Sequence, residues 1–312
     1  MKQIRVVVEG SLIFDLMTKA KTLPRVGQTL LGTGFAMGSG GKGANQAVQL
    51  ARLGADVTMI GRVGADFMGD YLLEKLKGEK IDTSFIIRDK ESSTGICAIH
   101  VDEEGRNDII VVLLANSRCS APDVEAAEKR IAEADIVLSQ LETTNEAMEK
   151  TVELGVKYGK RVILNPAPAS PVRSEIFNKV FLVTPNEKEA EEISGVMQGD
   201  YPPEEWRKRA ASSFHEQGAK NVILTLGEAG AYYSSEGKEL FVKAFKIKPE
   251  DSTAAGDAFN GALCYALALG KSVEEAIVWG NAAGALAVSR IGSQSSLCTM
   301  EELAAFLKKT AN

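Results

Sequence analysis

Ile136-Val-Leu-Ser-Gln-Leu-Glu142 is a short apolar run that ends on a carboxylate, and helical segments flank it on both sides. The same alternation of short apolar strands and helices continues along most of the C-terminal half of the chain. It predicts a mainly parallel, doubly wound α/β sheet that helices cover on both faces. The expected strands are 57–60, 85–87, 136–141, 162–164, 180–184 and 222–226, and the expected helices are 123–134, 145–158, 203–217 and three that close the chain.

The N-terminal third of the chain is organised differently. Its first strand, Ile4-Arg-Val-Val-Val8, is rich in β-branched residues, which predicts a central, buried position. Residues 12–37 show no helical period and are broken by proline and glycine, which indicates a small antiparallel excursion. The apolar runs between 94 and 114 predict a hairpin. We therefore expect one α/β domain over residues 1–312, with a small β-sheet lid built from these two segments.

The composition excludes several classes of protein. The chain has 312 residues, of which 45% are apolar and 25% charged, and its net charge of −6 gives no basic footprint for nucleic acid. Its N-terminal apolar run is far too short for a signal peptide or a membrane span. Four scattered cysteines lack the spacing of a zinc site and indicate reduced thiols. We expect a cytoplasmic protein that acts on small molecules and binds neither nucleic acid nor membranes.

A glycine-rich segment, Gly38-Ser-Gly-Gly-Lys-Gly43, opens a predicted helix over 44–53. It matches the dinucleotide pattern G-x-G-x-x-G, but about thirty residues separate it from the first strand, which a Rossmann unit would not have. It is not a Walker P-loop either, because the residue after Lys42 is glycine rather than serine or threonine. Two interpretations remain. The segment lets a ligand approach the backbone while Lys42 and Asn45 grip its hydroxyl groups, or it is a glycine-rich turn with a surface lysine.

Near the C-terminus, Asp251-Ser-Thr-Ala-Ala-Gly-Asp257 is a polar turn that opens another helix. Its small residues allow a ligand to approach the free N–H groups at the helix start, where an anion such as phosphate is the expected guest. Asp257 would place a carboxylate beside that anion, an arrangement that suggests chemistry between the two. The alternative is that Asp251, Ser252 and Asp257 only cap the helix.

Polar residues at the ends of the expected strands are further candidates. Because ligands of a doubly wound sheet bind beyond the carboxyl ends of its strands, these residues would converge on one cleft. Asn186 and Glu189 have the spacing of a capping box, which is the alternative for that pair. Asn165 lies in a rigid Asn-Pro-Ala-Pro turn. For Glu142 the alternative to a role in the site is that of an exposed strand-end carboxylate. The full set is Asp15, Glu142, Asn165, Asn186, Glu189 and Gly227.

Two separated motifs in this order, Gly40-Gly-Lys-Gly-Ala-Asn-Gln46 and the 251–257 turn, resemble those of the ribokinase family of ATP-dependent carbohydrate kinases. The resemblance implies an α/β sandwich with a β-sheet lid, which in this family also forms the contact of a homodimer. It also implies an enzyme that transfers the γ-phosphate of ATP to the 5-hydroxyl of a pentose, with D-ribose as the first candidate substrate. It continues along the whole chain, through Asn165-Pro-Ala-Pro-Ala169, Thr184-Pro-Asn-Glu187, Thr225-Leu-Gly-Glu-Ala-Gly230 and Gly292-Ser-Gln-Ser295.

The resemblance implies a role for each matching residue. Asp257 resembles the general base that takes the sugar proton, and its backbone amide, with those of Ala255 and Gly256, resembles the anion hole. Glu189 resembles the residue that organises Mg²⁺ through water. The sugar-binding positions are matched by Asp15, Gly41, Lys42, Asn45, Glu142 and Asp257, and the nucleotide-binding positions by Asn186, Thr225, Gly227, Gly230 and Asn281. A monovalent-cation site, usually for potassium, is matched by Asp251 with the carbonyls of Thr253, Ala287, Arg290 and Gly292.

The first turn of the chain departs from the family pattern. Ribokinases generally read Gly-Ser-x-Asn-x-Asp there, whereas this chain reads Gly10-Ser-Leu-Ile-Phe-Asp15, so that Ile13 replaces a sugar-binding asparagine. A hydroxyl left unpaired against an apolar wall would cost about 1–3 kcal/mol. A 2-deoxyribose kinase is therefore the main alternative, and another sugar or nucleoside kinase of this family is a further one. Leu114, where the family tends to have glycine, indicates a reshaped lid. A nicotinamide-dependent oxidoreductase that uses the 38–43 segment, and a catalytically idle sugar- or nucleotide-binding regulator, also stay open.

Overall fold

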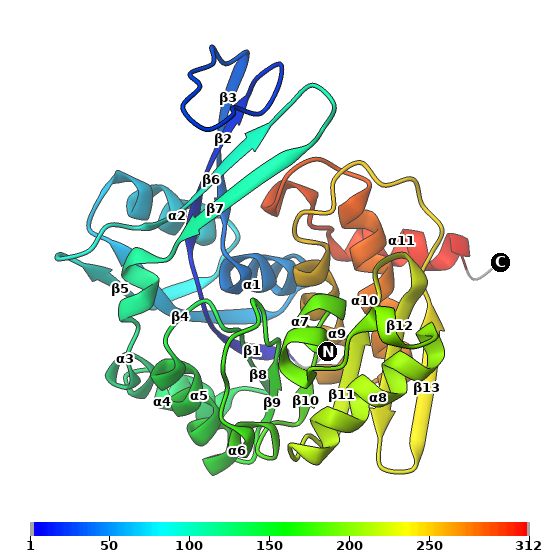
Figure 1. Ribbon diagram of the computed structural model, residues 1–312. Coiled ribbons are helices and arrows are strands. Elements are labelled where there is room, and N and C mark those ends of the chain that lie inside the picture. Colours follow the sequence, from blue (N-terminus) through cyan, green and yellow to red (C-terminus); the bar gives the residue numbers. More distant parts are fainter. Residues whose placement is uncertain (1–2, 311–312) are drawn as a thin grey trace.

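The structure is a computed structural model that describes residues 3–310. A large sheet with helices on both faces forms the body, and a smaller sheet projects from it (Figure 1). The strands are β1 Arg5–Glu9, β2 Ile13–Lys19, β3 Gly34–Gly40, β4 Asp56–Gly64, β5 Asp82–Asp89, β6 Gly95–Val101, β7 Asn107–Val112, β8 Ile136–Ser139, β9 Arg161–Leu164, β10 Leu182–Val183, β11 Asn221–Thr225, β12 Gly230–Ser235 and β13 Lys238–Lys243. The α-helices are α1 Lys42–Arg52, α2 Phe67–Gly78, α3 Ala121–Glu125, α4 Glu128–Glu133, α5 Asn145–Lys157, α6 Ser174–Phe177, α7 Glu187–Ser194, α8 Pro203–Glu216, α9 Ala255–Ala268, α10 Val273–Val288 and α11 Met300–Thr310. Within residues 3–310, none of these helices combines the length and the apolar content that a membrane crossing requires.

The large sheet has nine strands in the order β13-β12-β11-β10-β9-β8-β1-β4-β5. All pairings from β11 to β5 are parallel, and β12 and β13 add an antiparallel edge. Successive residues of a strand point to opposite faces, so Val6 and Val8 enter the core that includes α1, α2, α9, α10 and α11. Val7 enters the core that includes α3 to α8. The predicted doubly wound sheet, covered on both faces, is confirmed.

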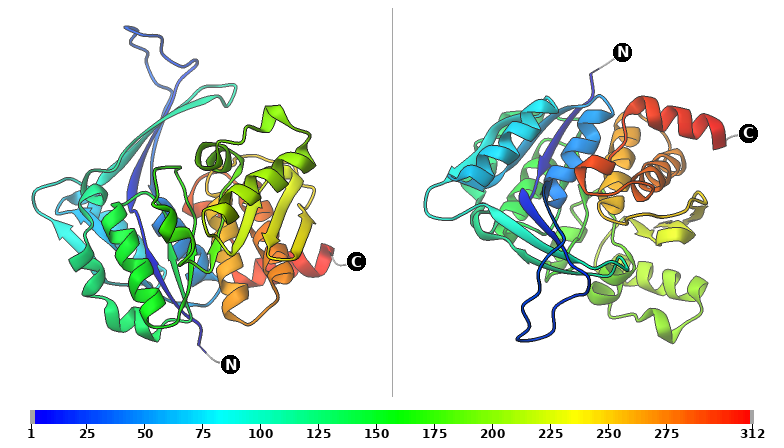
Figure 2. Two further views of the ribbon diagram at one scale, coloured as in Figure 1. Left: turned by 60° about the horizontal axis from the view of Figure 1, so that its bottom comes forward. Right: turned by 90° about the horizontal axis from the view of Figure 1, so that it is seen from above.

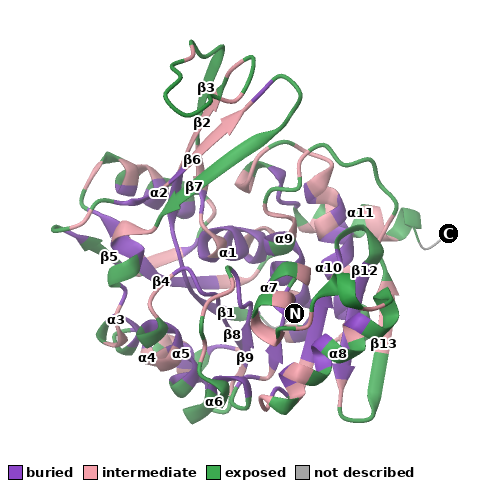
Figure 3. Cartoon of the chain, in the orientation of Figure 1, coloured by how far each residue is buried: buried purple, intermediate pink, exposed green. Residues whose placement is uncertain are grey.

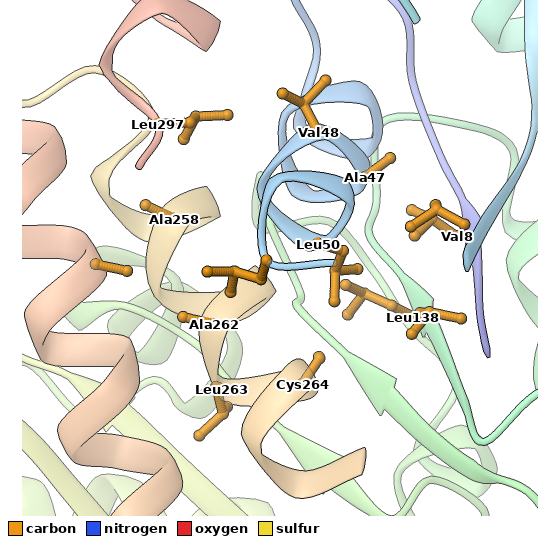
Figure 4. Packing of buried hydrophobic residues seen from close by; sticks show 14 of the residues in the cluster. Val8, Ala47, Val48, Leu50, Leu138, Ala258, Ala262, Leu263, Cys264 and Leu297 are labelled. Carbon is orange, nitrogen blue, oxygen red and sulfur yellow. The ribbon is translucent and has the colours of Figure 1, made fainter. Parts of the chain in front are cut away.

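Helices α1 and α9 pack against each other on one face of this sheet (Figure 4). Their approach is close because Gly261 of α9 faces Gln49 of α1. A Cβ added to Gly261 would lie only 2.7 Å from the Cβ of Gln49. Because α1 begins at the glycine-rich segment and α9 at the 251–257 turn, this packing brings the two sequence motifs together.

The smaller sheet, called the lid below, has the strand order β3-β2-β6-β7 and stands out from the body (Figure 2). It is built from the two segments that the sequence predicts, with one difference. Strand β3 runs on to Gly40, so Gly38 to Gly40 belong to a strand and not to a loop. Every residue of the edge strand β7 is exposed, including Ile109, Ile110 and Val112 (Figure 3). An exposed apolar edge strand of this kind is typical of a surface that meets another chain.

Three elements differ from the pattern expected from the sequence. Helix α2, which is not among the expected elements, begins at Asp66, whose Oδ1 accepts a hydrogen bond from the N–H of Gly69 (2.8 Å). The hairpin β12–β13 is also additional. The helix expected over 123–134 is two short helices, because the chain turns tightly between them and the N–H of Ala127 donates to the carbonyl of Val124 (3.0 Å).

Candidate active site

The start of α9 is shaped to receive an anion. Ala254, the residue before the helix, has a left-handed backbone with φ of 58°, which is unfavourable for a residue with a side chain and is held by the surrounding structure. Among the described residues, no side chain caps this helix. The N–H of Ala255 makes only a long hydrogen bond, 3.3 Å, to the carbonyl of Ser252. The first turn of α9 therefore offers N–H groups and the positive end of the helix dipole to a ligand.

Asp257 lies in this first turn and is buried, with 7% of its surface exposed. Its two carboxylate oxygens accept hydrogen bonds from α1: Oδ2 from Nδ2 of Asn45 (2.8 Å) and Oδ1 from Nε2 of Gln46 (2.9 Å). Burial raises the pKa of Asp257, and the positive charge of Lys42 and the two amides oppose this rise. The structure thus brings together Asp257, Asn45 and Lys42, which the sequence predicts as site residues, and adds Gln46.

Gln46 is the centre of a buried amide network behind Asp257. Its Nε2 also donates to Oδ1 of Asn165 (3.0 Å), and its Oε1 accepts from Nε2 of Gln140 (2.8 Å). The orientation of the Gln46 amide is therefore fixed from both sides. Asn165 has a role in this network beyond that of a residue in a rigid turn.

The network continues to the backbone of α9. Nδ2 of Asn165 donates to the carbonyl of Thr184 (2.9 Å), and the Thr184 hydroxyl donates to Oδ1 of Asn260 (2.6 Å). Asn260 in turn donates to the carbonyl of Gly256 (2.9 Å). Gln46, Gln140 and Asn260 are not among the site residues expected from the sequence. The signal for Gln46 is that it ends the first motif, four residues after Lys42.

Lys42, the first residue of α1, is surrounded by acidic side chains. Burial alone would lower its pKa, but the charges of three carboxylates raise it; they belong to Asp257, Glu142 and Glu189. Lys42 therefore stays protonated and supplies a partly buried positive charge at the point where the two motifs meet.

Glu142 is not an exposed strand-end carboxylate, which is the alternative to its role as a site residue. Only 7% of it is exposed, because β8 ends at Ser139 and the following residues lie against the turn after β1. Oε2 of Glu142 accepts hydrogen bonds from the hydroxyl of Ser11 (2.5 Å) and from the backbone N–H of Lys42 (2.9 Å). The carboxylate thus joins three segments of the chain at the candidate site.

Two glycines let α1 approach the turn after β1. Gly41 has φ of 91°, and a Cβ there would lie 2.8 Å from the carbonyl oxygen of Ser11. A Cβ at Gly43 would lie 2.6 Å from the carbonyl carbon of Gly10. Backbone atoms this close leave no room for a side chain, so glycine is needed at these two positions for α1 to pack against the chain's own turn after β1.

Asp15 and Ile13 lie on β2, where the lid joins the body, and side chains two residues apart on a strand share one face. Burial raises the pKa of Asp15 to about 7, and the negative charge of Glu142 adds to the rise. Ile13 is 2% exposed and pairs with Gly40 on one side and Gly95 on the other. A Cβ at Gly40 would lie 2.5 Å from Oδ1 of Asp15. The lid base therefore presents one carboxylate and one apolar side chain.

Asn186 and Glu189 form the capping box that their spacing predicts. The N–H of Glu189 donates to Oδ1 of Asn186 (2.9 Å), and the N–H of Asn186 donates to Oε2 of Glu189 (2.8 Å). Burial raises the pKa of Glu189, and Lys42 opposes this rise. The pair thus caps α7 and also places a buried carboxylate within electrostatic reach of Lys42.

The residues expected at the nucleotide lie near the end of β11. Thr225 is the last residue of that strand and forms a parallel bridge with Asn186. Gly227 and Gly230 both have positive φ, 51° and 117°, in the turn that leads into β12. Asn281 of α10 donates from Nδ2 to the carbonyls at 242 and 243 of β13, which pairs with β12 at Gly230. The end of β11, the turn into β12 and the contact of α10 with β13 therefore lie together at the edge of the large sheet beyond β11.

The turn at Asp251 is held by hydrogen bonds to its carboxylate. Oδ1 accepts from the N–H of Thr253 (2.9 Å) and from its hydroxyl (2.6 Å), and Oδ2 accepts from the N–H of Gly292 (2.9 Å). Burial alone would raise the pKa of Asp251, but these donors lower it. Ala287 lies in the last turn of α10 and Arg290 just after the helix, and the N–H of Arg290 donates to the carbonyl of Ala287 (3.1 Å). Asp251 therefore links the turn before α9 to the loop after α10.

Known proteins resemble this chain over nearly its whole length. Residues 3–300 match the model of the pfkB family of carbohydrate kinases. Ribokinase of Haemophilus influenzae is 40% identical over 301 residues, which cover 96% of this chain and 97% of that protein. Deoxyribokinase of Salmonella typhi is 33% identical over 303 residues, which cover 97% of this chain and 98% of that protein. The structure of Arabidopsis thaliana ribokinase complexed with ribose and ATP has a TM-score of 0.89 at 28% identity, and the match covers 98% of this chain and 99% of that chain.

These matches include both motifs, the lid and the body, and they confirm the resemblance that the motifs give. They also confirm the predicted enzyme class, an ATP-dependent sugar kinase, and give no support to the oxidoreductase alternative. The chain therefore belongs to the pfkB family of carbohydrate kinases.

Proposed function

We propose that this protein transfers the γ-phosphoryl group of ATP to the 5-hydroxyl group of a pentose, and that D-ribose is the substrate. The observation that carries the proposal is the arrangement of Asp257, a buried carboxylate that two amides of α1 hold at the anion-binding end of α9. The ribokinase relatives, and the complex of one of them with ribose and ATP, support this choice of substrates.

Asp257 is proposed as the general base. The 5-hydroxyl oxygen attacks the γ-phosphorus, the bond from that phosphorus to the β–γ bridging oxygen breaks, and ADP leaves, while the hydroxyl proton passes to Asp257. The amides of Ala255, Gly256 and Asp257 stabilise the negative charge on the transferring group. The uncapped start of α9 supports this assignment, because it offers N–H groups beside the carboxylate.

The sugar is proposed to lie between the lid base and the start of α1. Asp15, Asn45 and Glu142 supply hydrogen-bonding side chains, and Lys42 supplies a donor. Gly41 allows the sugar to approach the backbone. The positions of these residues around Asp257 support the assignment, since Asn45 contacts Asp257 directly and Glu142 contacts the backbone of Lys42.

The nucleotide is proposed to bind at the edge beyond β11, near Asn186, Thr225, Gly227 and Gly230, with Asn281 near the adenine. Bound Mg²⁺ would neutralise phosphate charge; it keeps several waters and needs only one or two carboxylates besides the phosphates. Glu189 fits this need as a buried carboxylate near Lys42. Within residues 3–310 no three acidic, histidine or cysteine side chains gather as direct ligands, which favours contact through water.

A monovalent cation, potassium, is proposed to bind at Asp251 with the carbonyls of Thr253, Ala287, Arg290 and Gly292. The residues fit a cation, because Asp251 is ionised and its turn leads directly into the anion hole. Such a cation supplies positive charge that stabilises the turn.

Potassium is expected to raise kcat several-fold over an equal concentration of tetramethylammonium, which is too large for a site lined by backbone carbonyls. The measurement is the initial rate in the two chloride salts at matched ionic strength. Asp251→Asn should remove most of the difference between the salts. Equal rates in both salts for the unmodified enzyme would contradict the cation site.

The substrate proposal is tested by an ADP-release assay over ribose, 2-deoxyribose, fructose and nucleosides. Ribose is expected to give the highest kcat/KM. A higher value for 2-deoxyribose would instead establish the alternative suggested by Ile13, which the Salmonella typhi relative named deoxyribokinase supports. Activity on none of these compounds would reject the pentose-kinase proposal.

Ile13→Asn is expected to raise the preference for ribose over 2-deoxyribose by about 10-fold, because the new amide would pair with a hydroxyl that 2-deoxyribose lacks. The measurement is the ratio of kcat/KM for the two sugars. Ile109→Asn, on the exposed lid strand β7, is a matched control that should leave the ratio unchanged. The same ratio in Ile13→Asn and the unmodified enzyme would mean that residue 13 does not face the sugar.

We also propose that the protein is a cytoplasmic homodimer that associates through the lid. The exposed apolar side chains of β7 support the lid contact. The cytoplasmic location is supported by the use of ATP and by four cysteines that are free and buried.

A further inference from the structure

Glu9, the last residue of β1, is a buried carboxylate to which the kinase mechanism gives no role. None of its surface is exposed. Its surroundings within residues 3–310 provide two hydroxyl groups as hydrogen-bond donors and no compensating positive charge. A fully buried carboxylate without a neighbouring positive charge is costly, so its presence at this position needs an explanation.

The two hydroxyl donors lie at the two ends of one short segment. The Ser139 hydroxyl donates to Oε2 of Glu9 (2.6 Å), and the Thr143 hydroxyl donates to Oε1 (2.6 Å). Between them lie residues 140–142, which leave the sheet at the end of β8. Glu9 therefore holds both ends of the 140–142 segment with its two oxygens.

The 140–142 segment supports both halves of the candidate site. Glu142 accepts hydrogen bonds from Ser11 and from the backbone N–H of Lys42. Gln140 donates to Oε1 of Gln46, the residue that orients the carboxylate of Asp257. A displacement of this segment would disturb the sugar site and the support of the base together.

Glu9 is costly to the fold in its ionised form. Burial raises its pKa to about 7, and two neutral hydroxyls compensate a buried charge only in part. A neutral glutamine at this position would offer an acceptor oxygen to the two hydroxyls without the cost of a buried charge. A need for stability alone thus gives no reason to have a carboxylate at this position.

We propose that Glu9 is a positioning residue for the kinase reaction, which fixes the 140–142 segment through Ser139 and Thr143 so that Glu142 and Gln140 keep their places. This inference rests on the proposed function, because it assigns Glu142 to the sugar. Glu9 itself touches neither the sugar nor the phosphates.

The kinetic test compares Glu9→Leu with Glu9→Gln. Glu9→Leu leaves both hydroxyls without their acceptor, and it is expected to raise the KM for the sugar about 5-fold or more while the KM for ATP stays within 2-fold. Glu9→Gln retains an oxygen acceptor and should restore the sugar KM to within about 2-fold of that of the unmodified enzyme. A lower melting temperature in Glu9→Leu with an unchanged sugar KM would show a purely structural role and overturn the inference.

Two threonine variants sharpen the test. Thr143→Val removes one of the two donors, and its effect on the sugar KM should not add to that of Glu9→Leu, since both break the same contact. Thr151→Val is the matched control, because it makes the same chemical change at a buried threonine whose hydroxyl donates to the carbonyl of Ala147 within α5. Thr151→Val should leave the sugar KM unchanged. Additive effects of Glu9→Leu and Thr143→Val on the sugar KM would contradict the proposal that Glu9 acts through Thr143.

Hydrogen exchange gives a readout that does not depend on the substrate. In Glu9→Leu, backbone exchange over 139–143 and at the N–H of Lys42, which donates to Glu142, should be at least 5-fold faster than in the unmodified protein. Unchanged exchange in both regions would overturn the inference whatever the enzyme phosphorylates. An unmodified enzyme that phosphorylates none of the sugars, combined with the expected exchange, would instead reject only the proposed function.

Discussion

Asp257→Asn is expected to lower kcat by about 10³-fold, because an amide cannot accept the proton of the attacking hydroxyl and a positioned general base contributes about 10²–10⁴-fold. The fold should survive. Burial raises the pKa of Asp257 in the folded state, so the ionised carboxylate destabilises the protein at neutral pH and its neutral replacement removes that cost. The measurements are the rate of ADP release at saturating sugar and ATP, and the melting temperature.

Asp70→Asn is the matched control for this substitution. Asp70 lies on α2 with 59% of its side chain exposed, where it pairs with Arg88, so the same chemical change should leave kcat unaltered. Turnover of Asp257→Asn within a few-fold of that of the unmodified enzyme would reject Asp257 as the base. A collapse of the melting temperature in Asp257→Asn would show that the carboxylate is needed for folding.

Lys42→Met is expected to lower kcat by about 10²-fold, the usual size of the effect when one charge-stabilising group is lost from a site. It should also shift the acidic limb of the pH–rate profile to higher pH. The sign follows from the structure: the positive charge of Lys42 lowers the pKa of Asp257, so without it the base loses its proton only at a higher pH. The measurement is kcat/KM for the sugar across the pH range.

Lys157→Met is the control for the loss of a lysine. Lys157 is exposed on α5 and pairs with Glu128. Lys157→Met should therefore change neither kcat nor the pH of the acidic limb of the pH–rate profile. A limb that does not move in Lys42→Met would mean that the acidic limb reports another group. Asp15, whose pKa burial raises to about 7, would then be the first candidate.

The main features of the fold could be predicted because the apolar runs are short and each ends at a turn signal. The alternation around 136–164 predicts parallel pairing, and β1, β8 and β9 do pair in that way. Helix α2 is absent from the expected elements although its signal was present, since its apolar residues recur at helical spacing after the capping residue Asp66. The break between α3 and α4 depends on local turn geometry that the hydrophobic pattern does not encode.

Site residues could be predicted where they belong to a recognisable sequence motif. Lys42 and Asp257 belong to distinctive motifs, and the structure brings them together. Gln140 and Asn260 belong to no such motif. An amide at the end of a strand or inside a helix gains its role only from hydrogen-bond partners elsewhere in the chain. The burial of Glu142 is likewise a property of the packed turn after β1 and not of its own segment.

The contacts that orient the proposed base join residues more than two hundred positions apart, at Asn45 and Gln46 on one side and Asp257 on the other. During synthesis the half of the chain with the proposed sugar-binding residues emerges first, and it lacks the proposed proton acceptor until α9 has docked onto α1. A ribosome-bound chain that stops before residue 251 would therefore have no kinase activity, even if the part of the sheet already synthesised had folded. Activity regained during refolding should therefore appear only once α9 has docked onto α1.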